Sequence, residues 1–172
     1  DKPLAHSKQV AEYFFEKELY PGQVFSCSAL RFAKEMRLSE KDKKALGPIK
    51  HVIGRTPNSW NKYIIHAIEP ILANLEPQGP VTHFKKINVK SNTKVDFCWE
   101  SGVTCSLQSW GKKNAPIELE FIGTQSSKKC VFFNSFQAFK KALETFINDS
   151  ILHNISHKKR IISSIELIEL GK

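Results

Sequence analysis

The chain has 172 residues, a formal net charge of +9 at pH 7 and 41% hydrophobic residues, which is enough apolar surface for a folded core. No apolar run approaches the roughly 20 residues that a membrane-spanning helix needs, and the N-terminus lacks the pattern of a signal peptide, so a membrane protein is not expected. The basic balance instead favours a polyanionic partner.

The first half of the sequence has the pattern of helices. Apolar residues at helical spacing predict helices over residues 7–19, 28–36, 39–54 and 57–75. Ser7 is a suitable N-cap for the first helix, and Thr56-Pro57 is a strong start signal for the fourth. Pro48 should bend or divide the third helix, Gly54 is its expected C-cap, and Pro70 should kink the fourth.

The proline-rich segment 76–80 separates this helical part from a second part with period-two alternation. The alternation predicts strands over residues 83–89, 94–100, 103–110, 117–122 and 129–133. Ser101-Gly102 should turn the chain between the second and third strands, and the short connections imply an antiparallel meander. Phe97 and Trp99 share the parity of Val95, so we expect them in the core.

Two helices should follow the strands. One covers residues 135–148, and the other begins near Ser156. The first has an apolar stripe that would cover one face of the sheet: Phe136, Phe139, Leu143, Phe146 and Ile147.

The fold class predicted from these patterns is α+β. An N-terminal helical region over residues 1–79, with the alternative of a helix-turn-helix, precedes an antiparallel β-meander packed on a C-terminal helix over residues 80–172. The two parts are expected to pack as one unit.

The four cysteines form no C-x-x-C pair and no cluster with zinc-ligand spacing. We therefore expect buried free thiols in a reducing, intracellular compartment, either cytoplasm or nucleus. Cys98 and Cys105 could face each other across a hairpin, which leaves a disulfide between them as the alternative.

Lysines recur in pairs in the second half, and two of these pairs fall in the predicted turns 111–114 and 126–129. Basic turns that converge on one side of a sheet would form a strip for a phosphate backbone. Lysine outnumbers arginine, so recognition by shape or strand type is favoured over base reading. The candidate nucleic-acid contacts are Lys41, Lys43, Lys44, Lys50, Arg55, Lys85, Lys86, Trp110, Lys112, Lys113, Lys128, Lys129, Lys158, Lys159 and Arg160.

A nuclease is the enzymatic alternative. The run Thr93-Lys94-Val95-Asp96-Phe97, a turn and then Cys105-Ser106-Leu107-Gln108 resembles the two-strand core of the PD-(D/E)xK nucleases. The resemblance implies carboxylates that hold Mg²⁺ and a lysine that supports the attacking water. Ser106 and Gln108 stand where that family has an acid and the lysine, so an active site would need Asp96, Glu118 and Glu120. A degenerate version that only binds is the other reading.

No further catalytic pattern is present. The glycines are isolated, so no glycine-rich phosphate loop is expected, and the six histidines are scattered without a metal or nucleophile motif. The sequence therefore predicts a nucleic-acid-binding module, DNA favoured over RNA, that is not an enzyme and has no cofactor. The alternatives are a Mg²⁺-dependent nuclease and a protein-interaction domain with protein partners in a larger assembly.

Overall fold

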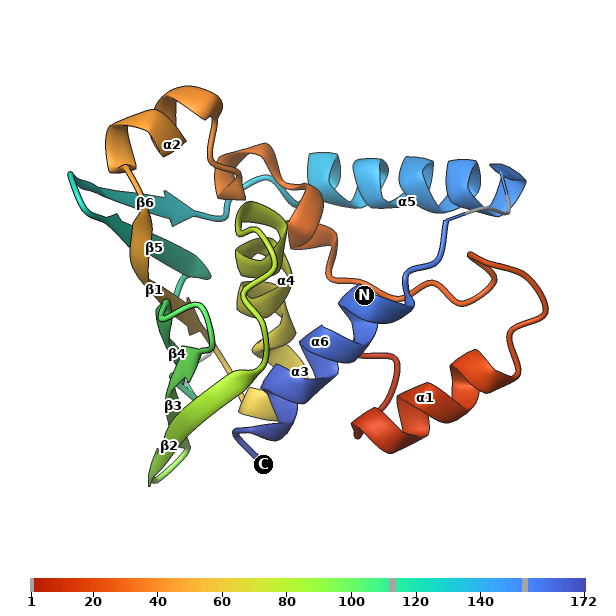
Figure 1. Cartoon of the computed structure of the whole chain (residues 1–172), viewed down its shortest axis with the longest axis horizontal. Helices are drawn as coiled ribbons and strands as arrows, with labels where there is room; N and C mark the ends of the chain where they lie inside the picture. The colour runs from red at the N-terminus through yellow and green to blue at the C-terminus, as the bar shows by residue number, and fades with distance from the viewer. Residues whose placement is uncertain (1, 112–113, 153–154) are drawn as a thin grey trace.

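The computed structural model describes residues 2–111, 114–152 and 155–172. The helical elements are α1 (Lys8–Glu16), the 3₁₀ turns η1 (Ala29–Phe32) and η2 (Lys34–Met36), α2 (Glu40–Leu46), α3 (Trp60–Tyr63), α4 (Ile65–Asn74), α5 (Ser135–Leu152) and α6 (Lys158–Glu169). The strands are β1 (Ile49–Thr56), β2 (Val81–Val89), β3 (Asn92–Trp99), β4 (Thr104–Ser109), β5 (Glu118–Gly123) and β6 (Ser127–Val131). Figure 1 shows the strands at one end of the molecule and most of the helices at the other.

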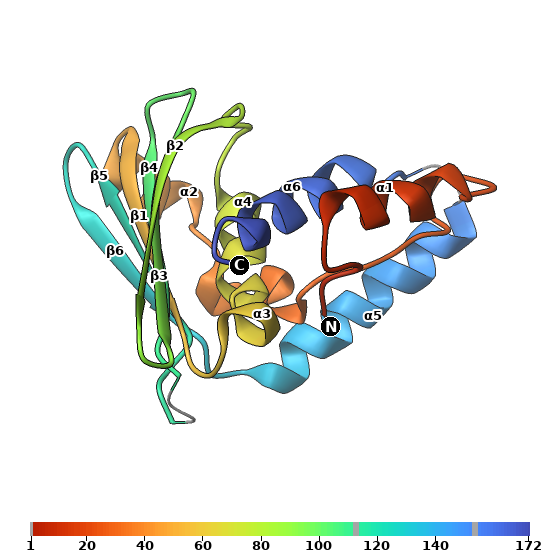
Figure 2. The ribbon, with the colours of Figure 1, turned by 90° about the horizontal axis from the view of Figure 1, so that it is seen from below.

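The six strands form one mixed sheet in the order β2-β3-β4-β1-β5-β6. Seen edge-on in Figure 2, the sheet has α1, α3, α4, α5 and α6 on one side, and its other face is uncovered. The strand β1 runs parallel to β4 and antiparallel to β5, with Val52 opposite Cys105 on one side and Phe121 on the other. The predicted antiparallel meander is therefore interrupted between β4 and β5 by a strand from the first half of the chain.

The predicted helix over residues 39–54 is wrong beyond Leu46. Ser39 and Asp42 form a capping box that starts α2, but the helix ends at Gly47 and the chain continues as β1. Gly54 lies inside β1 and is not a C-cap. A Cβ atom at this position would lie 3.1 Å from the Cβ of Ala67, so glycine lets α4 approach the strand closely. Because β1 occupies this segment, the helix-turn-helix alternative is also wrong.

Two other predicted helices are each divided into shorter elements in the structure. Residues 28–36 form two short 3₁₀ turns in place of one helix, and residues 57–75 form α3 and α4, which meet at Ile64. The first helix is confirmed as α1, and the Ser7 hydroxyl accepts a hydrogen bond from the Val10 N–H at 3.3 Å. Pro70 lies inside α4, as predicted.

The core lies between the sheet and the helices on its covered side. Phe97 and Trp99 are both buried there with their rings edge to face at 4.7 Å between centroids, which confirms their assignment to the core. The four cysteines are free thiols. Cys98 lies opposite Thr104 and Cys105 lies opposite Phe97, so these two cysteines are one register position apart, on opposite faces of the hairpin.

The helix α5 does not cover the sheet. It packs on η1, and the five residues of its apolar stripe are exposed to solvent. The prediction that this stripe buries one sheet face is therefore wrong. The core is closed instead by α4, whose residues from Ile65 to Ile71 are all buried, with α6 beyond it. Among the described residues, every helix is too short or too polar to cross a bilayer.

Candidate active site

Buried polar side chains gather where η1, α4 and α6 meet. Ser28, His66, Glu69 and Ser164 are each at most 5% exposed. Polar groups are rarely removed from water without hydrogen-bond partners inside the protein, so such a cluster needs an internal network. Its residues come from three segments that are far apart in the sequence, which is why local patterns do not reveal it.

Glu69 is the charged centre of this network. Its carboxylate accepts hydrogen bonds from Nη1 of Arg160 at 2.6 and 2.7 Å and from the hydroxyl of Ser164 at 2.6 Å. Arg31 adds a longer ion pair at 3.7 Å, and Nη2 of Arg160 also donates to the Ser26 carbonyl. These contacts hold α4, α6 and the segment before η1 in one fixed arrangement.

His66 lies one helical turn before Glu69 on α4. Its Nδ1 is 2.8 Å from the hydroxyl of Ser28, and its ring meets the ring of Tyr63 edge to face at 5.4 Å. Burial, together with a smaller effect of the positive charge of Lys2, lowers the pKa of His66 to about 4. The imidazole is therefore neutral at pH 7.

Ser28 can serve both tautomers of His66. Its hydroxyl oxygen accepts the Leu30 N–H at 3.2 Å, and this leaves one lone pair and the hydroxyl proton to accept from or donate to Nδ1. The ring orientation is thus fixed while Nε2 is free to accept or to donate a proton. Nε2 is therefore the ring nitrogen that proton transfer to a bound molecule would use.

Lys2 brings a positive charge to the same place. Its Nζ lies 5.4 Å from the centroid of the Tyr63 ring, on an exposed part of the surface. The carbonyl of Lys2 accepts a hydrogen bond from the Ser26 hydroxyl at 2.8 Å, which fixes the N-terminal segment against the chain that leads into η1. A cation beside a neutral imidazole can stabilise negative charge on an oxygen that loses its proton.

The candidate nucleic-acid contacts do not share one surface strip. Lys85 and Lys86 lie on β2, and Lys128 and Lys129 lie on β6, at the opposite edge of the sheet. The last two are strand residues and not the tip of a turn. The other candidates are distributed over α2 (Lys41, Lys43, Lys44), β1 (Lys50, Arg55), the end of β4 (Trp110) and α6 (Lys158, Lys159, Arg160), while Lys112 and Lys113 lie outside the described residues.

Several of these basic residues are paired within the molecule. Lys128 contacts Asp42 at 3.2 Å, and both Lys129 and Arg55 contact Glu118, at 2.6 and 2.8 Å. Internal pairing lowers the positive potential that a phosphate backbone would meet.

The carboxylates of the nuclease alternative are not brought together. Asp96 lies on β3, whereas Glu118 and Glu120 lie on β5, and the strands β4 and β1 separate them. Among the residues that the structure describes, no group of three or more metal-ligating side chains is found. The Mg²⁺ site proposed from the nuclease resemblance is therefore wrong.

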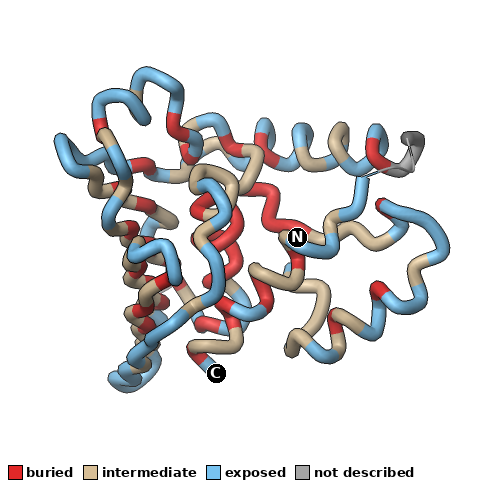
Figure 3. The backbone as a smooth tube through the Cα atoms, in the orientation of Figure 1, coloured by how far each residue is buried: buried red, intermediate tan, exposed pale blue. Residues whose placement is uncertain are grey.

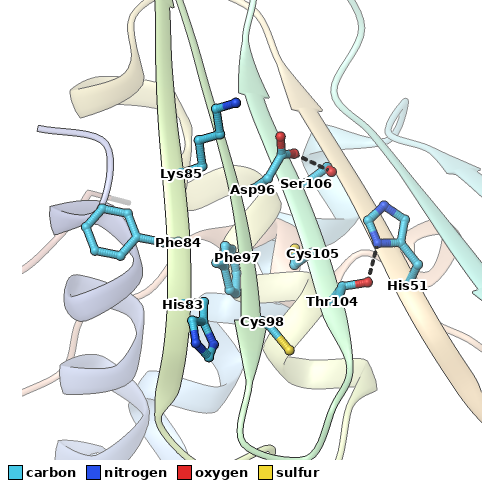
Figure 4. A pocket seen from close by; sticks show the side chains of 10 residues that line it. All are labelled: His51, His83, Phe84, Lys85, Asp96, Phe97, Cys98, Thr104, Cys105 and Ser106. Atoms are coloured by element: carbon cyan, nitrogen blue, oxygen red, sulfur yellow. Dashed lines mark hydrogen bonds between the residues drawn. The ribbon is translucent and has the colours of Figure 1, made fainter.

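A second cluster of polar side chains lines a cavity of about 330 Å³ on the uncovered sheet face (Figure 4). Asp96 accepts a hydrogen bond from Ser106 at 2.6 Å, and Nδ1 of His51 lies 2.7 Å from the hydroxyl of Thr104. Burial would raise the pKa of Asp96, but the bonds from Ser106 and Lys94 outweigh it and leave the pKa lowered. Asp96 is thus ionised and already hydrogen-bonded, so this cluster offers less for chemistry than the one around His66.

Sequence reasoning missed Lys2, Ser28, Tyr63, His66 and Glu69, and it named Arg160 for a different purpose. One signal was present. His66 and Glu69 interrupt the apolar run YIIHAIEPIL, and polar residues inside such a run must be buried with partners. The partners themselves come from distant segments and leave no local trace.

Comparison with known proteins identifies solved structures that share this fold. No family model matches the sequence, and no curated protein matches it either. Solved structures do match, over almost the whole chain. Myo-inositol 2-dehydrogenase from Lactobacillus plantarum has a TM-score of 0.69 at 14% identity, covering 98% of this chain and 68% of that one.

Two further structures give the same result. Myo-inositol dehydrogenase from Corynebacterium glutamicum has a TM-score of 0.72 at 15% identity, with 98% of this chain and 67% of that one covered. Myo-inositol dehydrogenase from Lactobacillus casei, in complex with NAD(H) and myo-inositol, has a TM-score of 0.75 at 11% identity, with 99% and 65% covered. The chain has the fold of these dehydrogenases. It spans about two thirds of the length of each.

These similarities correct the functional predictions. The structures that share the fold are dehydrogenases, which contradicts both the nucleic-acid-binding module and the nuclease, and with them the expectation of a protein that is not an enzyme. The expectation of no cofactor, or of Mg²⁺ alone, is contradicted by the NAD(H) in the complex from Lactobacillus casei. The net charge and the paired lysines therefore led to the wrong functional class.

Proposed function

We propose that this chain is the substrate-handling part of an NAD-dependent oxidoreductase that acts on a polyhydroxylated, sugar-like alcohol. The fold it shares with inositol dehydrogenases along 98–99% of its length supports the reaction class. The observation that carries the proposal is the buried, neutral imidazole of His66 beside the ammonium group of Lys2. These are the two kinds of group that deprotonation of an alcohol needs.

His66 is the acid–base group of this proposal. Oxidation of an alcohol to a ketone removes the hydroxyl proton, and a base must accept it. With a pKa of about 4, His66 is deprotonated throughout the neutral range. Ser28 fixes the ring through Nδ1, so Nε2 accepts the proton in oxidation and returns it in reduction.

Lys2 and the Glu69 network assist this proton transfer. The Lys2 ammonium group stabilises the alkoxide character of the oxygen as its proton leaves. Glu69, Arg160 and Ser164 do not touch the reacting atoms, and they act by fixing α4 and therefore His66. Their role is positioning.

The described residues do not fit a dinucleotide by themselves. A doubly wound nucleotide-binding domain places a glycine-rich turn between its first parallel strand and a helix, because the backbone must approach the pyrophosphate. Here β1 leads to α3 through Pro57-Asn58-Ser59, which contains no glycine, and β1 and β4 are the one parallel strand pair described. We therefore derive no step through NAD from these residues and assign its binding to a unit outside them.

The test is an oxidation assay on the protein as its gene encodes it, with NAD⁺ or NADP⁺ and a panel of inositols, hexoses and nucleotide sugars. The His66→Ala variant should lose about 10²–10⁴-fold in rate on any substrate that the wild type oxidises. His51→Ala is the matched control, because His51 is a half-buried histidine hydrogen-bonded to a hydroxyl but lies on the uncovered sheet face. Absence of turnover across the panel, or equal rates for the two variants, would reject the proposal.

A further inference from the structure

The helix α5 has three distinct faces. One face, marked by Ala138 and Ala142, packs on η1, and Ala138 is fully buried. A second face is polar, with Lys140 and Lys141 both near Glu144. The third face, roughly 120° around the helix from Ala138, is the apolar stripe. The helix therefore turns its small residues inward and its largest apolar residues outward.

The start of α5 is fixed without help from that stripe. The carboxylate of Glu35 in η2 accepts hydrogen bonds from the N–H groups of Phe133 and Asn134, at 3.2 and 2.8 Å. Asn134 in turn accepts the Gln137 N–H at 3.2 Å, as an N-cap does. With its start tied to η2 and its alanines on η1, the helix holds most of its apolar stripe out to solvent.

The exposed stripe is large for a surface feature. Its residues are between 41% and 73% exposed, and Figure 3 shows most of the length of α5 as exposed or half-buried. A large apolar side chain has on the order of 200 Å² of surface, so the stripe presents roughly 500 Å² on one helix face. A contiguous apolar patch of several hundred Å² marks an interaction surface.

We infer that the α5 stripe is the docking surface for the dinucleotide-binding unit of the same oxidoreductase. This inference depends on the proposed function. The dehydrogenases that share the fold are about half as long again as this chain, and the described residues hold no dinucleotide cradle. The unit that supplies the cradle therefore needs a place to dock, and the stripe offers an apolar helix face with five large side chains that are each at least 41% exposed.

The stripe also leads to the candidate active site. Phe146, in its C-terminal half, packs against Phe25 with 5.3 Å between ring centroids. Phe25 lies three residues before Ser28, which holds His66. A unit seated on α5 would thus stand beside the residues that handle the substrate proton, where a dinucleotide must lie.

The area argues against a second copy of this chain as the occupant. A stable interface between separate proteins buries about 800 Å² on each partner, whereas the stripe offers roughly 500 Å². An interface between units of one protein needs less area, commonly 600–1,500 Å² counted over both sides, because the units are already held together.

Maleimide labelling of a cysteine placed in the stripe tests the inference. Leu143→Cys is introduced both into this chain and into the full protein that its gene encodes, and site-specific labelling is followed by mass spectrometry. Labelling should be at least about tenfold slower in the full protein, as expected when the docked state dominates by about 1.4 kcal/mol. Lys141→Cys on the polar face of α5 is the matched control and should label equally in both.

Each other outcome overturns the inference in a recognisable way. Equal labelling of Leu143→Cys in both proteins means that nothing docks on the stripe, even if the protein oxidises substrate with NAD⁺. Protection in a full protein that binds no NADH, measured by tryptophan-to-NADH energy transfer, means that the occupant is not a dinucleotide-binding unit. A third outcome is that Leu143→Cys of this chain alone labels more slowly as the protein concentration rises, and that sedimentation shows a dimer. The occupant is then a second copy of the chain.

Discussion

The depressed pKa of His66 predicts a pH-dependent stability that one substitution should remove. In the unfolded chain this histidine takes up a proton near pH 6.5, but in the folded protein it resists protonation until about pH 4. Between these values the unfolded state binds more protons, so folding is favoured above pH 6.5 and this stability is lost as the pH falls toward 4. The cause is burial against Ser28 and Tyr63, together with the charge of Lys2.

The pKa difference corresponds to roughly 3 kcal/mol, at 1.36 kcal/mol for each pKa unit. The variant His66→Asn keeps a side-chain amide near the position of Nδ1 but does not titrate. We expect the difference in unfolding free energy between wild type and variant to fall by roughly 3 kcal/mol from pH 7.5 to pH 4. Urea unfolding followed by tryptophan fluorescence measures it. Two stability curves that stay parallel within about 1 kcal/mol would refute the buried, neutral state of His66.

Three further substitutions, two of them with a matched control variant, test the packing around the site and in the sheet. Glu69→Ala leaves Arg160 buried without its partner and should cost about 3–5 kcal/mol in urea unfolding, whereas the exposed Glu76→Ala should cost under about 0.5 kcal/mol. Phe97→Ala should cost about 3–5 kcal/mol, and Phe84→Ala, which lies directly opposite on the exposed edge strand, should cost under about 1 kcal/mol. Gly54→Ala should lower the unfolding free energy by about 1–3 kcal/mol, because the added methyl group meets Leu107 and Ala67, and a thermal melt equal to wild type would contradict that packing.

Local patterns in the sequence identified most of the strands and one hairpin correctly. Residues 94–100 and 103–110 alternate cleanly because one face of each strand is buried, and β3 and β4 follow within a residue or two. The core assignment of Phe97 and Trp99 rested on the same parity. These features depend on neighbours in the chain, and sequence patterns report such neighbours well.

The insertion of β1 could not be read in the same way. Val52 pairs with Cys105 and Phe121, which lie more than fifty residues further along the chain, and no local signal specifies such partners. The lysines of residues 41–50 continued the helical pattern of α2 into this segment, and Pro48 was interpreted as a kink although it marks the change from helix to strand.

The candidate site was missed for a related reason. His66 was one of six scattered histidines, and its role depends on Ser28 and Lys2, which reach it only in the folded chain. The paired lysines were conspicuous in the sequence, but the fold places the pairs 85–86 and 128–129 on opposite sheet edges, and Lys128 and Lys129 contact carboxylates. Charge that is visible in a sequence therefore says little about where the potential will lie.

The central position of β1 sets the order in which this protein can fold. The hairpin β3-β4 and the pair β5-β6 can each form from nearby residues within microseconds, but neither completes the sheet. The sheet is complete only when β1 enters between β4 and β5, where it pairs parallel with β4 and antiparallel with β5. Until then the inner edges of β4 and β5 carry unpaired backbone groups that can join strands of another molecule. We therefore expect slow refolding, and aggregation when the protein is diluted out of denaturant at high concentration.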